Sequence, residues 1–188
     1  MEADLMNQLG PLAVLAGVWE GDKGADEAPS DDRGTEQNRF REKITFAPIG
    51  AVRNHEQVLH GLRYATVAHR LGEADSFHEE VGYWLWDPGE QQVLRCFIVP
   101  RGVALVAGGT VEQTATSFTL VADCGSETYG ICSNRFLNRE FKTVRYELTV
   151  TILDVNRFHY REDTQLRMPG RKDLFHHTDE NTLMRISK

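Results

Sequence analysis

The chain has 188 residues, of which 40% are hydrophobic and 26% charged, and its 21 basic and 28 acidic residues give a formal net charge of −7. This length suits one domain with a core that needs no disulfide or metal, so we expect a single domain over residues 1–188. The sequence has no basic block and no apolar run of about 18 residues, which argues against nucleic-acid and membrane partners. Met1-Glu2-Ala3-Asp4 does not resemble a signal peptide, so a cytoplasmic location is the expectation.

The N-terminal segment predicts a short helix that leads into a first strand. Apolar residues gather toward the end of Leu5–Leu15, as in a short helix that closes one end of a fold. Gly17 then allows the chain to turn into a strand that carries Trp19, because glycine adopts backbone angles that other residues avoid. Residues 22–34, rich in Asp, Glu, Gly and Ser, predict a solvated acidic loop after that strand.

From about Gln37 onward, the pattern is typical of successive antiparallel strands. The clearest strand is Thr143–Leu153, and the turn at residues 154–156 leads to its hairpin partner over residues 157–167. One face of the first of these strands is apolar: Val144, Tyr146, Leu148, Val150 and Ile152. Further turns are predicted at Pro48-Ile49-Gly50, Leu71-Gly72-Glu73, Asp87-Pro88-Gly89-Glu90 and Pro100-Arg101-Gly102.

These elements predict an all-β fold, a single closed antiparallel β-barrel of about ten strands with a short N-terminal helix. Closure pairs every edge strand, whereas a two-sheet sandwich, the structural alternative, leaves edges exposed. A polar stretch over residues 169–181 precedes the last strand, which we expect at Thr182–Ile186. This stretch is a second place to look for function.

Several classes of chemistry find no motif in the sequence. It contains no Gly-x-Ser-x-Gly elbow for a hydrolase and no phosphate-binding glycine loop. The three cysteines have spacings of neither a redox pair nor a zinc site, so we expect reduced thiols. Cys96 lies between Leu94 and Ile98 in an apolar alternation, which predicts that this thiol faces the packed interior.

Histidine is the residue type with the most chemical promise, because imidazole ligates transition metals and haem iron near neutral pH. Seven are present, and His176 and His177 are the best candidates. As neighbours in an extended chain they point in opposite directions, so at most one of them enters a barrel. His78 shares a strand face with Trp84 and Trp86, which together would form a wall for a planar aromatic ligand.

Several segments together resemble the nitrobindin family, a group of small haem-binding β-barrels shaped like fatty-acid-binding proteins. Residues 11–21 resemble that family's opening, a proline–leucine run into Gly-x-Trp-x-Gly, and residues 77–84 resemble its His-x-Glu-x-Gly-aromatic-Trp strand. Residues 98–109 resemble a strand pair joined by a Pro-x-Gly turn. Leu166–Met168 and His176-His177 resemble the late segment that supplies a methionine near the haem and the axial histidine.

The resemblance implies haem b at the barrel mouth, with His177 as the axial ligand of the iron and His176 as the alternative. It places His78 and Met168 on the open side of the pocket, and Trp84 among the residues that hold the cofactor. Members of the family with ferric iron are associated with isomerisation of peroxynitrite to nitrate, and a histidine-held ferric iron is a suitable Lewis acid. The long acidic segment at residues 22–34 is a departure that would reshape the mouth.

Two other functions stay open for such a barrel. It could bind a fatty acid or another apolar small molecule without haem, with His176 and His177 on the surface, or its own aromatic side chains could fill the cavity. The expected partners are therefore haem or a small molecule, and an oligomer is compatible with the sequence. In related barrels an arginine of the last strand packs on the Gly-x-Trp tryptophan, which predicts that Arg185 stacks on Trp19.

Overall fold

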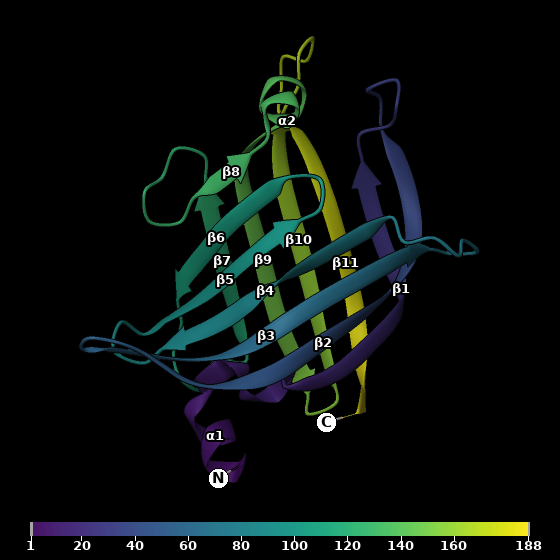
Figure 1. Cartoon of the computed structure of the whole chain (residues 1–188). Helices are drawn as coiled ribbons and strands as arrows, with labels where there is room; N and C mark the ends of the chain where they lie inside the picture. Colours follow the sequence, from purple (N-terminus) through teal and green to yellow (C-terminus); the bar gives the residue numbers. More distant parts are fainter. Residues whose placement is uncertain (1, 188) are drawn as a thin grey trace.

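The computed structural model describes residues 2–187 as a closed antiparallel β-barrel (Figure 1), which confirms the predicted fold class. Among these residues, no helix is long and apolar enough to cross a membrane. The elements in chain order are α1 (Glu2–Gln8), the 3-10 helix η1 (Gly10–Leu15), β1 (Gly17–Ala28), β2 (Glu36–Asn54), β3 (Gln57–Arg70), β4 (His78–Asp87), β5 (Gln92–Val99), β6 (Val103–Thr110), β7 (Ser117–Asp123), β8 (Ile131–Ser133), α2 (Arg135–Glu140), β9 (Lys142–Asp154), β10 (Arg157–Arg167) and β11 (Phe175–Ser187).

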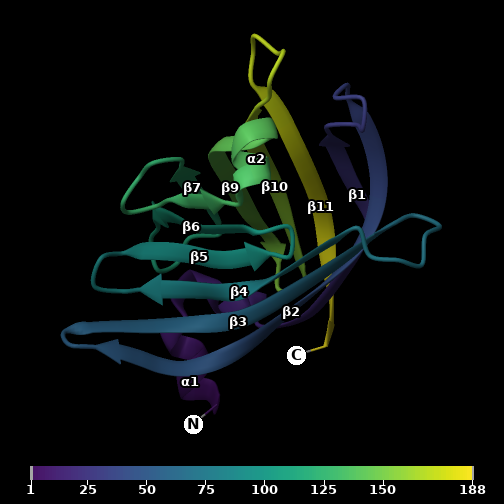
Figure 2. The ribbon, with the colours of Figure 1, turned by 45° about the horizontal axis from the view of Figure 1, so that its top comes forward.

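The barrel closes because β5 pairs with both β4 and β6. The order around the sheet is β5-β4-β3-β2-β1-β11-β10-β9-β7-β6, and the short β8 lies beyond β6. The first and last strands, β1 and β11, pair side by side. The pairing between β6 and β7 is the shortest in the barrel wall, because it has one pair of residues in register, Gly108 and Val121. Figure 2 shows the strands wrapped around one interior, so function is expected inside the barrel.

The N-terminal segment closes one end of the barrel, as the sequence predicted. Leu12 and Leu15 of η1 are fully or almost fully buried, and the Trp19 indole donates a hydrogen bond of 2.7 Å to the Leu15 carbonyl oxygen. The ring of Trp86 lies directly against Gly10. In Figure 1, α1 lies at the opposite end of the barrel from α2, so the end beside α2 remains for an opening.

Two long hairpins extend further than the sequence indicated. The predicted acidic loop is wrong over most of its length, because β1 continues to Ala28 and pairs with β2. A register shift between Gly21 and Gly24 bends β1 and keeps its second half in the barrel wall. The last strand likewise begins at Phe175 rather than Thr182, so the polar residues before Thr182 belong to the wall.

β-Bulges explain two further differences between the predicted and the observed strands. The chain does not turn at residues 48–50, because β2 continues through a register shift between Ile49 and Val52 and reverses only after Asn54. In β9, a register shift near its start places Thr143 rather than Val144 on the inner face, since the extra residue of a bulge reverses the alternation.

The prediction for Cys96 is also wrong. On β5 the inner positions include Arg95 and Phe97, both buried, whereas Cys96 and Ile98 lie on the outer face. Apolar residues therefore occur on both faces of this strand, and one charged residue, Arg95, stands among those on the inner face. The three cysteines are free thiols in the described part of the chain.

Candidate functional site

The barrel encloses a cavity of about 540 Å³, a size typical of sites for small molecules and cofactors. Leu15 of η1 lines its closed end. Ala28 and Pro29 of the β1–β2 hairpin, and Leu137 and Phe141 in and beside α2, line the opposite end. The cavity therefore opens at the end where β1 and β10 finish and β2 and β11 begin.

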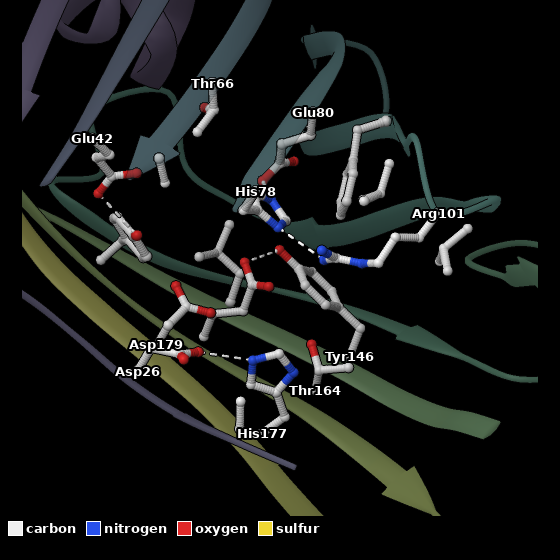
Figure 3. Close-up of a pocket in the computed structure, with 18 of the residues that line it drawn as sticks. Asp26, Glu42, Thr66, His78, Glu80, Arg101, Tyr146, Thr164, His177 and Asp179 are labelled. Atoms are coloured by element: carbon white, nitrogen blue, oxygen red, sulfur yellow. Dashed lines mark hydrogen bonds and ion pairs between the residues drawn. The ribbon is translucent and has the colours of Figure 1, made fainter. Parts of the chain in front are cut away.

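The wall of this cavity changes character with depth. Near the mouth, apolar side chains form a ring: Phe40, Phe77, Val99, Leu137, Phe141 and Leu166. Aromatic side chains cover the floor, among them Phe46, Trp84 and Phe158. A polar layer separates the two: Asp26, Glu42, Thr66, Glu80, Tyr146, Glu162 and Asp179, several of which are labelled in Figure 3.

His177 lies on the inner face of β11 and is held by an acidic partner. Its Nε2 lies 2.9 Å from Oδ1 of Asp26, whose Oδ2 accepts a hydrogen bond of 2.9 Å from Asn38. Burial alone would raise the pKa of Asp26, but the hydrogen bonds from His177 and Asn38 hold it below its ordinary value. The His177 side chain is 29% exposed, and Nδ1 has no hydrogen-bond partner among residues 2–187.

His78 lies on the facing wall with both of its nitrogens engaged (Figure 3). Nδ1 lies 3.0 Å from Nη2 of Arg101, and Nε2 lies 3.2 Å from Oε1 of Glu80. Because a guanidinium only donates, Nδ1 must accept, and the proton on Nε2 is the one donated to Glu80. This arrangement fixes the tautomer of His78 in which Nε2 carries the proton.

A buried arginine organises the polar layer. Arg95 donates to Glu80 at 2.8 Å and to Glu162 at 2.9 Å, and it also donates to the hydroxyls of Tyr64 and Tyr146. Burial would raise the pKa of Glu80, but Arg95 and His78 outweigh it and hold that pKa at about 2. The positive charge of Arg95 is therefore already balanced by two carboxylates.

Two further carboxylates lack such compensation. Burial raises the pKa of Glu42 to about 7, although Asn181 and Tyr160 donate hydrogen bonds of 2.8 and 2.9 Å to its Oε1. Burial, together with nearby carboxylates of which Glu162 is the strongest, raises the pKa of Asp179 well above its ordinary value. No ion pair and no side-chain hydrogen bond balances Asp179 among the described residues.

The structure brings some of the predicted site residues together and separates others. His177, His78 and Trp84 line the cavity. His176 points outward and pairs with Asp163 at 2.7 Å. Met168 is buried beside the mouth with Leu166 and Phe175 and does not line the cavity, because the chain has left the inner wall before it.

Sequence reasoning missed most of the polar layer. Asp26 was assigned to a loop, and Glu42, Arg95, Glu162 and Asp179 carry no motif. What these residues share is the two-residue alternation of a strand. Each lies two positions from another inward-facing residue on the same strand. Reading that signal requires knowing which face of each strand is internal.

The residues near the mouth fit a haem group. Two imidazoles line the cavity. His78 has both ring nitrogens engaged, whereas His177 stands beside the ring of apolar side chains, which suits a porphyrin. Arg70 and Arg101 line the same end and offer cations for propionates. One adjustment is needed, since the Nε2 that would bind iron is the atom held by Asp26.

Comparisons with known proteins give a family and a fold. The model of the family described as "THAP4-like, heme-binding beta-barrel domain" matches residues 8–185. Among solved structures, Rv2717c from M. tuberculosis is similar with a TM-score of 0.68 and 22% sequence identity, over 95% of this chain and 96% of that chain. That similarity shows a shared fold. No curated protein matches the chain.

Proposed function

The chain belongs to the THAP4-like, heme-binding β-barrel domain family, and from that premise we propose that it binds haem b at the barrel mouth with His177 as the axial ligand of the iron. The observation that carries the proposal is the position of His177. It is the inward-facing member of the His176-His177 pair, and it stands beside the apolar ring of the mouth. His78 has both ring nitrogens engaged and is the weaker candidate.

The surrounding residues would prepare the site in distinct ways. Asp26 holds Nε2 of His177 by a hydrogen bond and would have to release this atom to an incoming haem. Phe40, Phe77 and Leu166 exclude water from the porphyrin faces. These roles concern the binding of haem, the activity that membership of a heme-binding family supports.

A peroxynitrite isomerase activity is the finer part of the proposal. Bound ferric haem would supply a Lewis acid for the rearrangement of peroxynitrite to nitrate. On the wall that faces His177, Arg101 offers a positive charge that attracts an anionic substrate. Arg101 occupies Nδ1 of His78 and Glu80 accepts from its Nε2–H, so this N–H stays committed to Glu80 rather than free to protonate the substrate.

The alternative, a fatty-acid carrier without haem, has less support. A fatty-acid carboxylate inside a barrel needs an available cation, because a buried charge without a partner is costly. Arg95 is the buried cation of this barrel, and Glu80 and Glu162 already balance it. An acid entering the polar layer would meet carboxylates instead.

The test is a titration of the purified protein with haemin, followed in the visible spectrum. We expect a histidine-bound Soret band for the wild type and for His176→Ala, the matched control on the outer face. His177→Ala should lose that band. A band that survives His177→Ala would move the ligand to another residue, and no band in any variant would reject haem binding. Equal decay of peroxynitrite with and without the loaded protein would reject the isomerase activity alone.

A further inference from the structure

Three carboxylates stand side by side on the inner wall of the barrel, below the level of His177. Asp179 of β11 is registered directly opposite Asp26 of β1 on one side and opposite Glu162 of β10 on the other. All three line the cavity. Directly opposed residues on paired strands have Cβ atoms about 5 Å apart, and like charges in such pairs are destabilising.

The outer two members of this row have cationic or hydrogen-bonding partners. Asp26 is paired with His177, and Glu162 with Arg95 and Tyr146. Asp179, in the middle, has no such partner among the described residues. A fold would gain stability by replacing this side chain with a neutral one, so its presence indicates a use.

A second polar side chain is unsatisfied across the same cavity. Thr66 is only 5% exposed, and its hydroxyl has no hydrogen-bond partner in the described part of the chain. Figure 3 shows Thr66 and Glu42 on one wall and Asp179 and Asp26 on the other. Both unsatisfied groups therefore border one internal space.

The floor beneath this space is aromatic. Trp84 packs edge-on against Phe46 and Tyr64, with ring centroids 6.0 and 6.1 Å apart. The guanidinium of Arg95 already lies over the rings of Tyr64 and Trp84, with its Cζ atom 5.5 and 5.4 Å from their centroids, so these rings offer apolar contact rather than a free face for a cation. A carboxylate above such a floor suits an organic cation, because the ammonium group meets negative charge while its apolar body leaves water. An anionic ligand would find no unpaired cation at this depth, since Arg95 is already balanced.

We propose that the polar layer is a binding site for a small primary amine with an aromatic or apolar body, whose ammonium group is held by Asp179. Glu42 and Thr66 on the facing wall would receive its other polar groups. Asp179 is one inward-facing position deeper on β11 than His177, in the same cavity as the proposed haem site. The inference does not depend on haem binding.

The test compares three ligands of one shape by isothermal titration calorimetry on the haem-free full-length protein. We expect protonated tyramine, whose phenol hydroxyl can meet Glu42 and Thr66, to bind at least tenfold more tightly than 3-(4-hydroxyphenyl)propionate or 2-(4-hydroxyphenyl)ethanol. Asp179→Asn should weaken the amine at least tenfold, and Asp163→Asn, the matched change on the outer face of β10, should leave its affinity within twofold. Thr66→Val should weaken it severalfold.

An amine that binds no more tightly than the acid, or an unchanged affinity in Asp179→Asn, would overturn the proposal. If Asp179→Asn does not fold, Glu42→Gln takes its place. It should also weaken amine binding, and an unchanged affinity would overturn the proposal. Haemin titration of Asp179→Asn separates the two sites, because His177 is intact and the Soret band should match that of the wild type. Loss of haemin binding in both proteins would count against the haem proposal only.

Discussion

The guanidinium of Arg185 stacks on the indole of Trp19, with its Cζ atom 4.2 Å from the ring centroid. This contact joins β11 to β1 at the closed end of the barrel, and it confirms the stacking that the sequence predicted. The same guanidinium donates hydrogen bonds to the carbonyl oxygens of Val14, Ala16 and Val155. Arg185 therefore connects three segments of chain where the first and last strands meet.

Replacing Arg185 with alanine should destabilise the protein by roughly 2 to 3 kcal/mol, because the stacking is lost and several carbonyl groups lose their donors. Arg185→Lys should recover only part of this, since an ammonium lacks the planar fork. Urea unfolding measures both. Arg157→Ala, which removes an exposed pair with Asp154, is the control and should cost less than about 0.5 kcal/mol. Wild-type stability in Arg185→Lys would show that the planar group is dispensable.

Removing Asp26 should strengthen haemin binding. Asp26 occupies the Nε2 atom of His177, and breaking that hydrogen bond opposes coordination by about 1 kcal/mol at this partly exposed pair, or roughly fivefold in affinity. We therefore expect Asp26→Ala to raise haemin affinity severalfold in a competition assay. Asp163→Ala, which removes the equivalent partner of His176 on the outer face, should leave the affinity unchanged. A weaker affinity in Asp26→Ala would mean that Asp26 orients His177 for coordination.

The sequence was sufficient for the barrel because strand alternation and turn residues are local signals. It was insufficient for the inner wall, as Arg95 illustrates. Arg95 shares the inner face of β5 with the buried apolar residues Val93, Phe97 and Val99, because Glu80 and Glu162 meet it there. Glu162 is 67 residues away in the chain, so this compensation has no local signature.

The histidine pair illustrates the same limit at one position. Extended geometry indicated that only one of His176 and His177 enters the barrel, but the choice depends on the register of β11. The sequence placed the start of that strand at Thr182, whereas it begins at Phe175. The observed register places Asp179 opposite both Asp26 and Glu162, and such cross-strand neighbours cannot be read from one segment.

Glu42 should make stability depend on pH. Its pKa is raised from 4.5 to about 7 in the folded protein, so the folded state retains this proton more strongly than the unfolded chain does. The stabilising effect of the proton is present below pH 4.5 and is lost as the pH rises to 7, at a cost of up to about 3 kcal/mol. Glu42→Gln keeps an acceptor for Tyr160 and Asn181 without ionising.

The comparison is made by urea unfolding at pH 4.5 and pH 8. Relative to the wild type, Glu42→Gln should gain stability between these two values, while the exposed control Glu147→Gln should show little change. A difference between Glu42→Gln and wild type that stays constant across this range would show that Glu42 ionises in the folded protein as it does in the unfolded chain.

Gly82 is the position on β4 where a single methyl group should be most damaging. It pairs with Tyr64 on one side and Phe97 on the other. A Cβ atom there would overlap the carbonyl oxygen of Cys96 and lie 2.8 Å from Cα of Phe97. Both contacts are with backbone atoms, so relief requires β4 and β5 to move apart.

We expect Gly82→Ala to destabilise the protein by about 3 kcal/mol, the upper part of the usual range for overpacking. Thermal unfolding measures this, with Gly50→Ala as the control, because a Cβ at Gly50 meets nothing within 4 Å. The control should stay within about 0.5 kcal/mol of wild type. Since Glu80 and Arg95 lie on these same two strands, the separation should also disturb their 2.8 Å ion pair. Wild-type stability in Gly82→Ala would mean that the two strands are packed less closely than the structure describes.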